Sequence, residues 1–214
     1  MRDTREIAKE IVSKLTIEEK LQMFVNHVEV ERLNLPSIYF GGEAAHGLQA
    51  RSGQGESYEP TKSTSFTQPI GMAASFDKEL IKEAGDVVGT EVRAFYNMQN
   101  KSVGIMRWAP TVDLCRDPRW GRNEEGYGED PYLTGKMAGA YIEGMQDEHN
   151  YDGSEIKAGE RGDRIRVGTT LKHFYANNVE WRRCADSVDV PEKVKYDYEL
   201  EPYRYCIEDS HAEA

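Results

Sequence analysis

Apolar side chains recur at helical spacing in four separate stretches of the chain. They return every three or four residues, which places them on one face of a helix. The stretches are residues 3–25, 77–98, 131–147 and 191–209. Thr16 and Glu19 form a capping-box pattern that restarts the first helix. Asp77 can cap the second, and Pro131 and Pro191 suit the first turn of the last two.

Short apolar runs rich in β-branched and aromatic residues alternate with these helices and predict strands. The runs are residues 35–40, 70–76, 105–114 and 166–171. Gly41 and Gly42 stop the first run, and Pro110 breaks or ends the third. Polar connectors are expected at 51–68, 116–130 and 148–165. Because strand and helix patterns alternate at least four times, we expect βαβ units and an α/β fold with a parallel sheet.

Composition narrows the class of protein. The 214 residues carry a formal net charge of −11, with 38% hydrophobic and 30% charged residues. That length allows one large domain or two small ones. The acidic balance argues against binding nucleic acid or an anionic membrane surface. The sequence also lacks an apolar run of about 18 residues that would span a bilayer. A neutral substrate is therefore expected.

The cysteines and the start of the chain bear on the compartment. Cys115, Cys184 and Cys206 are odd in number, widely spaced and without a CxxC pair, so neither a disulfide framework nor a zinc site is expected. The charged start has no apolar segment after it, so we expect no signal peptide and a cytoplasmic protein. Glu43 and His46 stand three apart without HExxH, and there is no Walker loop or GxGxxG. We expect no metal and no cofactor.

Loops that follow strands carry the candidate chemistry, because such loops build the sites of parallel α/β folds. These loops supply Glu43, His46, Asp113, Arg122, Lys172, His173 and Arg183. Adjacent strand residues point to opposite faces, so the backbone must leave the strand at Lys172 and His173 if both serve one site. Charged groups bonding to neutral hydroxyls contribute roughly 1.5–3 kcal/mol each. The set therefore predicts a cage for a polyhydroxylated substrate.

Each candidate also has a structural alternative. Lys172 and His173 can be a solvated strand end, and His46 before Gly47 can be a packing histidine. The acidic residues at 124–130 can form a solvated loop that also favours a helix N-terminus. Trp108 and Trp120 can stack on a sugar, but packing in the core is the commoner role of buried aromatics.

Three motifs together resemble the family 3 glycoside hydrolases. They are EAAHG at 43–47, DPRWGR at 117–122 followed by GEDPYL at 128–133, and KHFYANN at 172–178. The members of this family are retaining exo-β-glycosidases such as β-glucosidases and β-xylosidases. The resemblance extends from LTIEEK at 15–20 to YELEPY at 198–203, which is nearly the whole chain.

The resemblance implies part of a TIM-like (β/α)8 barrel. Residues 1–214 would be an incomplete N-terminal barrel domain of roughly four to five βα units, with a helical segment at 1–35. It implies that the residues holding the terminal sugar of a β-linked oligosaccharide or glycoside in subsite −1 are Glu43, Arg122, Lys172, His173 and Arg183. Many β-glucosidases of the family carry Asp where this chain has Glu43. The longer side chain is similar to the xylosidase-like branch, so glucose and xylose both stay open.

The resemblance also implies what this chain lacks. Retaining hydrolysis needs two carboxyl groups that flank the scissile bond, a nucleophile and an acid/base. In the family the nucleophile is an Asp on a later barrel strand, and the acid/base usually comes from a following domain or loop. Both would lie beyond Ala214. We therefore expect the isolated chain to be inactive and to need a later part of the same protein.

Two other functions compete with this interpretation. One is a non-catalytic carbohydrate-binding fragment that uses the same cage without turnover. The other is a barrel enzyme of a different class, such as an aldolase-type lyase with Lys172 as a Schiff base, which needs a desolvated lysine amine.

Overall fold

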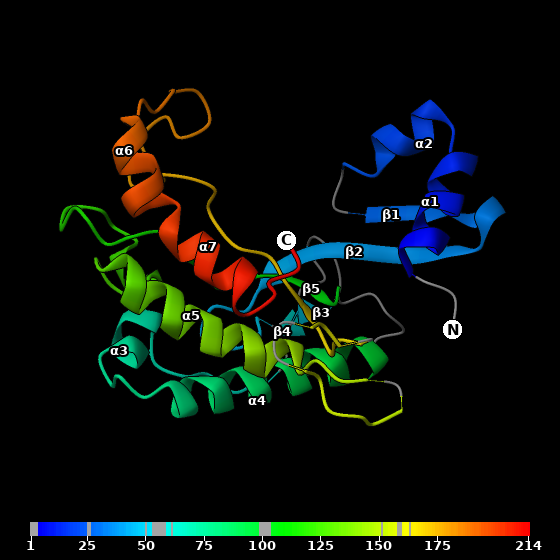
Figure 1. The fold of residues 1–214 in the computed structure, drawn as a ribbon, viewed down its shortest axis with the longest axis horizontal. Helices are drawn as coiled ribbons and strands as arrows, with labels where there is room; N and C mark the ends of the chain where they lie inside the picture. The colour runs from blue at the N-terminus through cyan, green and yellow to red at the C-terminus, as the bar shows by residue number, and fades with distance from the viewer. Residues whose placement is uncertain are drawn as a thin grey trace.

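The computed structural model describes residues 4–24, 27–49, 51–52, 59–60, 62–98, 104–150, 152–157, 160–162 and 164–214 (Figure 1). The helices are α1 Thr4–Lys14, α2 Ile17–Gln22, α3 Pro69–Ala73, α4 Lys78–Met98, α5 Pro131–Gln146, α6 Glu192–Val194 and α7 Glu201–Glu208. The strands are β1 His27–Val30, β2 Leu35–Glu43, β3 Arg51–Ser52, β4 Glu59–Pro60, β5 Met106–Trp108 and β6 Gly168–Thr169. Short 3-10 turns η1 and η3 cover Glu31–Leu33 and Asn123–Glu125, and a π turn, η4, covers Lys195–Glu199.

The main sheet has the order β1-β2-β5-β6. β1 is antiparallel to β2, whereas β2, β5 and β6 are parallel. Beyond β6, the Ala214 N–H donates to the Thr169 carbonyl at 3.0 Å, and the Leu171 N–H donates to the Ala214 carbonyl at 2.7 Å. This alternation is that of a parallel ladder. Three parallel strands and a fourth position at Ala214 confirm the expected part of an α/β barrel.

Helices cover one side of the sheet. α4 packs on α5 and α5 on α7, while α1 and α2 lie beside β1 at the far end of β2 (Figure 1). Three expected starting signals are confirmed. Thr16 and Glu19 form a reciprocal capping box, the Leu80 N–H donates to Asp77 at 3.0 Å, and Pro131 lies in the first turn of α5. Pro191 is instead the residue before α6, and Asp130, which was not predicted as a cap, accepts from the Leu133 N–H at 2.6 Å. No helix in the described part of the chain has the length and apolarity to cross a lipid bilayer.

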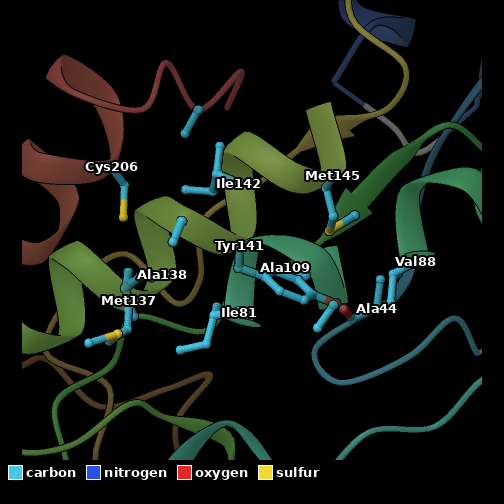
Figure 2. Close-up of a cluster of buried hydrophobic side chains, with 14 of the residues drawn as sticks. Ala44, Ile81, Val88, Ala109, Met137, Ala138, Tyr141, Ile142, Met145 and Cys206 are labelled. Atoms are coloured by element: carbon cyan, nitrogen blue, oxygen red, sulfur yellow. Dashed lines mark hydrogen bonds between the residues drawn. The ribbon is translucent and has the colours of Figure 1, made fainter. Parts of the chain in front are cut away.

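The core lies between α4, α5 and the sheet. Ile81 and Val88 of α4 share one buried cluster with Tyr141, Ile142 and Met145 of α5, and all five side chains are fully buried (Figure 2). Glycines bring the two helix backbones together. A Cβ at Gly144 would overlap the carbonyl oxygen of Lys82, and one at Gly89 would lie 2.5 Å from the carbonyl oxygen of Met145. The α4–α5 contact is therefore made in part by backbone against backbone.

Two expected strands differ from the structure. The run at 70–76 is wrong as a strand, since residues 69–73 form α3 with Pro69 in its first turn and with Met72 and Ala73 buried. A short apolar run does not distinguish a buried strand from a buried helix turn. The run at 35–40 does not stop at the glycines, because β2 continues through Gly41 and Gly42 to Glu43. Of the expected loop at 51–68, residues 53–58 and residue 61 lie outside the described residues.

Candidate functional site

A β-bulge at the end of β2 presents Glu43. Phe40 pairs with Met106 and Glu43 pairs with Trp108, so three steps along β2 match two along β5. Gly41 and Gly42 have φ of +131° and +100°, a region that favours glycine. A Cβ at Gly41 would lie 2.6 Å from the Trp108 ring. The glycines thus permit the extra residue, and bulges redirect the side chains that follow them.

Lys172 meets Glu43 from across the sheet. The Val112 N–H donates to the Lys172 carbonyl at 2.9 Å, so pairing between the β5 and β6 segments continues beyond Pro110. The Lys172 side chain is 10% exposed, and its Nζ lies 2.6 Å from Oε2 of Glu43, which is 42% exposed. The Lys172 side chain is therefore held by a carboxylate, whereas Schiff-base formation needs a free, desolvated amine.

His173 is fixed by Asp113, which follows β5. Its backbone N–H donates to Oδ1 of Asp113 at 3.0 Å, and its Nδ1 lies 2.6 Å from Oδ2. Nη2 of Arg122 lies 3.3 Å from Nε2 of His173. Because a guanidinium can only donate, Nε2 is the acceptor, and this geometry fits the neutral imidazole with its proton on Nδ1.

Arg122 is clamped by Glu125 in the η3 turn. Its Nε and Nη2 donate to the two carboxylate oxygens of Glu125, both at 2.7 Å. This bidentate pair lowers the pKa of Glu125 and raises the pKa of Arg122. The clamp fixes the plane of the guanidinium and keeps it charged beside His173.

Arg183 reaches the same group of residues through Glu180. Its Nη1 donates to Oε2 of Glu180 at 2.9 Å. Oε1 of Glu180 lies 3.6 Å from Nη1 of Arg122 and accepts from Trp120 Nε1 at 3.4 Å. Partial burial raises the pKa of Glu180, but the hydrogen bonds from Arg183 and Trp120 and the charge of Arg122 outweigh it and lower the pKa. Glu180 thus joins the loop after Lys172 to the loop after β5.

The five predicted residues are linked by these contacts but line two cavities. Glu43, Arg122 and Lys172 line a cavity of about 450 Å³, called the first cavity below. His173 and Arg183 line a second cavity of about 690 Å³. Sequence reasoning treated all five as one pocket.

Several other residues belong to the site. Asp113 was a candidate without a role, and Glu125 was interpreted as part of a solvated acidic loop. Glu125 stands three residues after its partner Arg122, and that spacing was a signal in the sequence. Asp113 and its partner His173 lie 60 positions apart, so no local spacing pointed to that pair. Ser63, Thr64 and Gln68 also line the first cavity. Glu91 of α4 anchors that segment by accepting from Thr64 Oγ1 at 2.7 Å.

The structural alternatives for His46 and Trp120 hold in part. Nδ1 of His46 lies 3.0 Å from the Phe66 carbonyl, so it ties two loops together, although the residue also lines the first cavity. Trp120 is buried, with its indole N–H directed to Glu180. Within the described ranges, no cluster of three or more His, Cys, Asp or Glu is placed to hold a metal ion.

Comparisons with known proteins agree with this arrangement. Residues 6–214 match the family model described as "Glycosyl hydrolase family 3 N terminal domain". Beta-D-xylosidase 3 of Arabidopsis thaliana is 36% identical over 209 residues, which is 94% of this chain and 26% of the relative. Beta-xylosidase/alpha-L-arabinofuranosidase 2 of Medicago sativa subsp. varia is 35% identical over 208 residues, which is 94% of this chain and 25% of the relative. The chain thus spans about a quarter of the length of these curated relatives.

Solved structures show the same relationship. A GH3 exo-beta-xylosidase in complex with a xylobiose aziridine activity-based probe matches with a TM-score of 0.78 and 28% identity, over 96% of this chain and 26% of that chain. Beta-glucosidase 3B of Thermotoga neapolitana in complex with glucose has a TM-score of 0.74 and 26% identity, over 94% of this chain and 28% of that chain.

Proposed function

Since this chain belongs to glycosyl hydrolase family 3, we propose that it supplies the sugar-holding part of an enzyme that hydrolyses terminal, non-reducing β-D-glycosyl residues. The observation that carries the proposal is the first cavity. There the Glu43–Lys172 ion pair and the clamped Arg122 guanidinium come together from three different strand ends.

The first cavity suits one sugar ring. Its volume of about 450 Å³ lies in the range of small-molecule pockets. Glu43 offers carboxylate acceptors, whereas Lys172 and Arg122 offer donors, so both sides of a hydroxyl group can be satisfied. Charge-assisted hydrogen bonds of this kind contribute roughly 1.5–3 kcal/mol each. His173 and Arg183 support this proposal through Arg122 and Glu180, from the wall of the second cavity.

We propose that the carboxylates beside the first cavity bind and position the sugar and do not cleave the glycosidic bond. Glu43 is paired with Lys172, Asp113 with His173, and Glu125 with Arg122. A general acid needs a raised pKa, whereas the pKa of Glu125 is lowered. We therefore infer that the nucleophile and the acid/base of retaining hydrolysis come from another part of the protein, and that these 214 residues alone are inactive.

The substrate is proposed to be a β-D-xyloside, with a β-D-glucoside as the second candidate. Both curated relatives named above are called xylosidases. Glu43 also reaches further into the cavity than an aspartate would, which leaves less room for a hydroxymethyl group. The β-D-glucoside is the second candidate because beta-glucosidase 3B of Thermotoga neapolitana, a similar structure, is in complex with glucose.

Titration of the chain with D-xylose and D-glucose, followed by NMR, tests the proposal. Lys172→Met removes the ammonium group and keeps most of the side-chain volume. We expect it to weaken D-xylose binding about tenfold or more, the effect of losing one charge-assisted hydrogen bond. Lys157→Met is the matched control, because that side chain is 82% exposed and lies outside both cavities.

Two results would contradict the proposal. Unchanged D-xylose binding by Lys172→Met would show that the first cavity is not the sugar site. Turnover of an aryl β-xyloside by the 214-residue chain would show that its own carboxylates suffice for hydrolysis.

A further inference from the structure

Ala176 has an unfavourable backbone conformation three residues after His173. Its φ is +63°, in the left-handed region that a residue with a Cβ adopts only at a cost. Such residues persist where the surrounding structure holds them. Ala176 is also buried, at 6% exposure, so its backbone carbonyl needs a donor from the protein. The contacts of Ala176 therefore show what fixes the loop after His173.

Arg116 supplies that donor. Its Nη2 donates to the Ala176 carbonyl at 3.1 Å, and its Nη1 pairs with the carboxylate of Glu199. The Glu199 side chain is only 4% exposed, whereas that of Arg116 is 29% exposed. A buried carboxylate needs a charged partner, so Glu199 determines where the guanidinium of Arg116 stands. One nitrogen of the guanidinium then reaches the loop and another reaches Glu199.

Glu199 lies in the π turn η4, and the helical segment around η4 contacts the same loop at two further points. Nζ of Lys195 lies 5.5 Å from the centre of the Tyr175 ring. The Tyr203 ring meets that of Phe174 edge to face, with centroids 5.4 Å apart. Each of three consecutive loop residues is thus held by this segment, the third of them indirectly.

The position of Arg116 also bears on Asp113, the residue that fixes His173. Burial lowers the pKa of Arg116, whereas the nearby charges of Tyr198 and Asp113 act in the opposite direction. Asp113 already accepts from the backbone N–H of His173 and holds its Nδ1. Without the carboxylate of Glu199, the guanidinium would be drawn towards Asp113 and would compete with His173 for the same two oxygens.

We propose that Glu199 is a positioning residue of the candidate site. It holds Arg116 on the loop, and so keeps His173 in the orientation in which Nε2 accepts from Arg122. The effect on a sugar rests on the proposed function of the first cavity. The orientation of His173 does not depend on which ligand binds there.

Glu199→Gln in the 214-residue chain tests the proposal, because it removes the charge and keeps the size of the side chain. Proton–nitrogen correlation NMR spectra of the imidazole rings report which nitrogen of His173 carries the proton. We expect the Nδ1–H form in the wild type and a mixture of both tautomers in the variant. D-xylose should bind roughly two- to tenfold more weakly to the variant, the effect of losing one hydrogen bond that supports Arg122.

Glu148→Gln is the matched control. Glu148 is also a largely buried carboxylate, at 14% exposure, and it pairs with Arg161, but it lines neither cavity. The same change of carboxylate to amide should therefore leave both the His173 spectrum and the D-xylose affinity unchanged.

Arg116→Met shows whether Glu199 acts through Arg116. It removes the donor to Ala176 from the more exposed partner of the pair, so it should give the same mixture of tautomers. The double variant Glu199→Gln/Arg116→Met should bind D-xylose no more weakly than Arg116→Met alone, because two residues that act as one unit are not additive. Arg116→Met also keeps the proposal testable if Glu199→Gln does not fold.

The outcomes separate the positioning role from the proposed function. A single Nδ1–H tautomer of His173 in Glu199→Gln, or the same change of spectrum in Glu148→Gln, would overturn the role of Glu199. Additive losses in the double variant would overturn its action through Arg116. A wild type that does not bind D-xylose, together with the expected change at His173, would overturn the proposed function and support the positioning role.

Discussion

The α4–α5 layer and the strand-end loops are held together in different ways. In the helix layer, glycines allow the two helix backbones to approach closely. Side chains of that layer such as Ile81 and Ile142 are fully buried. In the loops, ion pairs and hydrogen bonds link partly exposed groups such as Glu43 and Glu125. Packing of the first kind tolerates little change in volume, whereas partly exposed ion pairs contribute little to stability. Stability and the proposed sugar binding should therefore respond to different substitutions.

The largest loss of stability is expected from Gly144→Ala. The added methyl group would overlap the Lys82 carbonyl and lie 2.8 Å from the Asp86 nitrogen, and both are backbone atoms that cannot turn aside. Overpacking of this kind costs about 1–3 kcal/mol, and more where backbone must move. Urea denaturation followed by circular dichroism measures it.

Gly121→Ala is the matched control, because an added methyl group there meets nothing within 4 Å. Its free energy of unfolding should stay within about 0.5 kcal/mol of the wild type. Equal effects of the two substitutions would show that close backbone contact is not what joins α4 to α5.

An intermediate loss is expected from Tyr141→Phe, where the two regions meet. The buried Tyr141 hydroxyl donates to the Ala44 carbonyl at 2.5 Å, directly after Glu43 (Figure 2). Its removal leaves that carbonyl without its donor, which costs about 1–3 kcal/mol. Thermal denaturation and D-xylose titration should show a lower Tm together with weaker binding. A lower Tm with unchanged binding would mean that α5 does not help to position Glu43.

The smallest effect is expected from Glu125→Gln, and it depends on pH. Hydrogen bonds from Arg122 lower the pKa of Glu125 below its ordinary value of 4.5. The folded state therefore binds this proton less readily than the unfolded state. The pair's contribution is present above pH 4.5 and is lost as the pH falls through the lowered value. For a partly exposed pair we expect at most about 1 kcal/mol at neutral pH.

Denaturation of wild type and Glu125→Gln at pH 7 and near pH 3 measures this contribution. The difference in unfolding free energy should shrink at the acidic pH. A difference that is constant or larger in acid would mean that the charge on Glu125 does not stabilise the fold.

Local signals were enough to predict most helices. Asp77 and the Thr16–Glu19 pair cap their helices through residues only three positions away, so the sequence carries the whole interaction. The run at 70–76 failed because it becomes a helix turn through burial of Met72 and Ala73, which depends on α5. When a contact with residues far away in the sequence determines the structure of a segment, the hydrophobic periodicity of that segment does not reveal it.

The same limit applies to the site. The residues Glu43, Lys172 and Arg122 were predicted from motifs, but their contacts were not. Lys172 and Glu43 lie 129 positions apart and meet only because β2 and β6 flank β5. The role of Glu180 depends on how the loop after Lys172 folds back on Trp120, and so does the division of the site into two cavities.

The extra residue at Gly41–Gly42 also decides which changes of chain length β2 can accept. Because three steps along β2 match two along β5 here, removing one glycine would restore regular pairing with Glu43 still opposite Trp108. The bend that the bulge gives to the strand before Glu43 would be lost, although no residue of the ion pair had been replaced. Deletion of one glycine should thus displace Glu43 relative to Lys172 and weaken their ion pair, whereas a deletion among residues 152–157, which line neither cavity, should leave it intact.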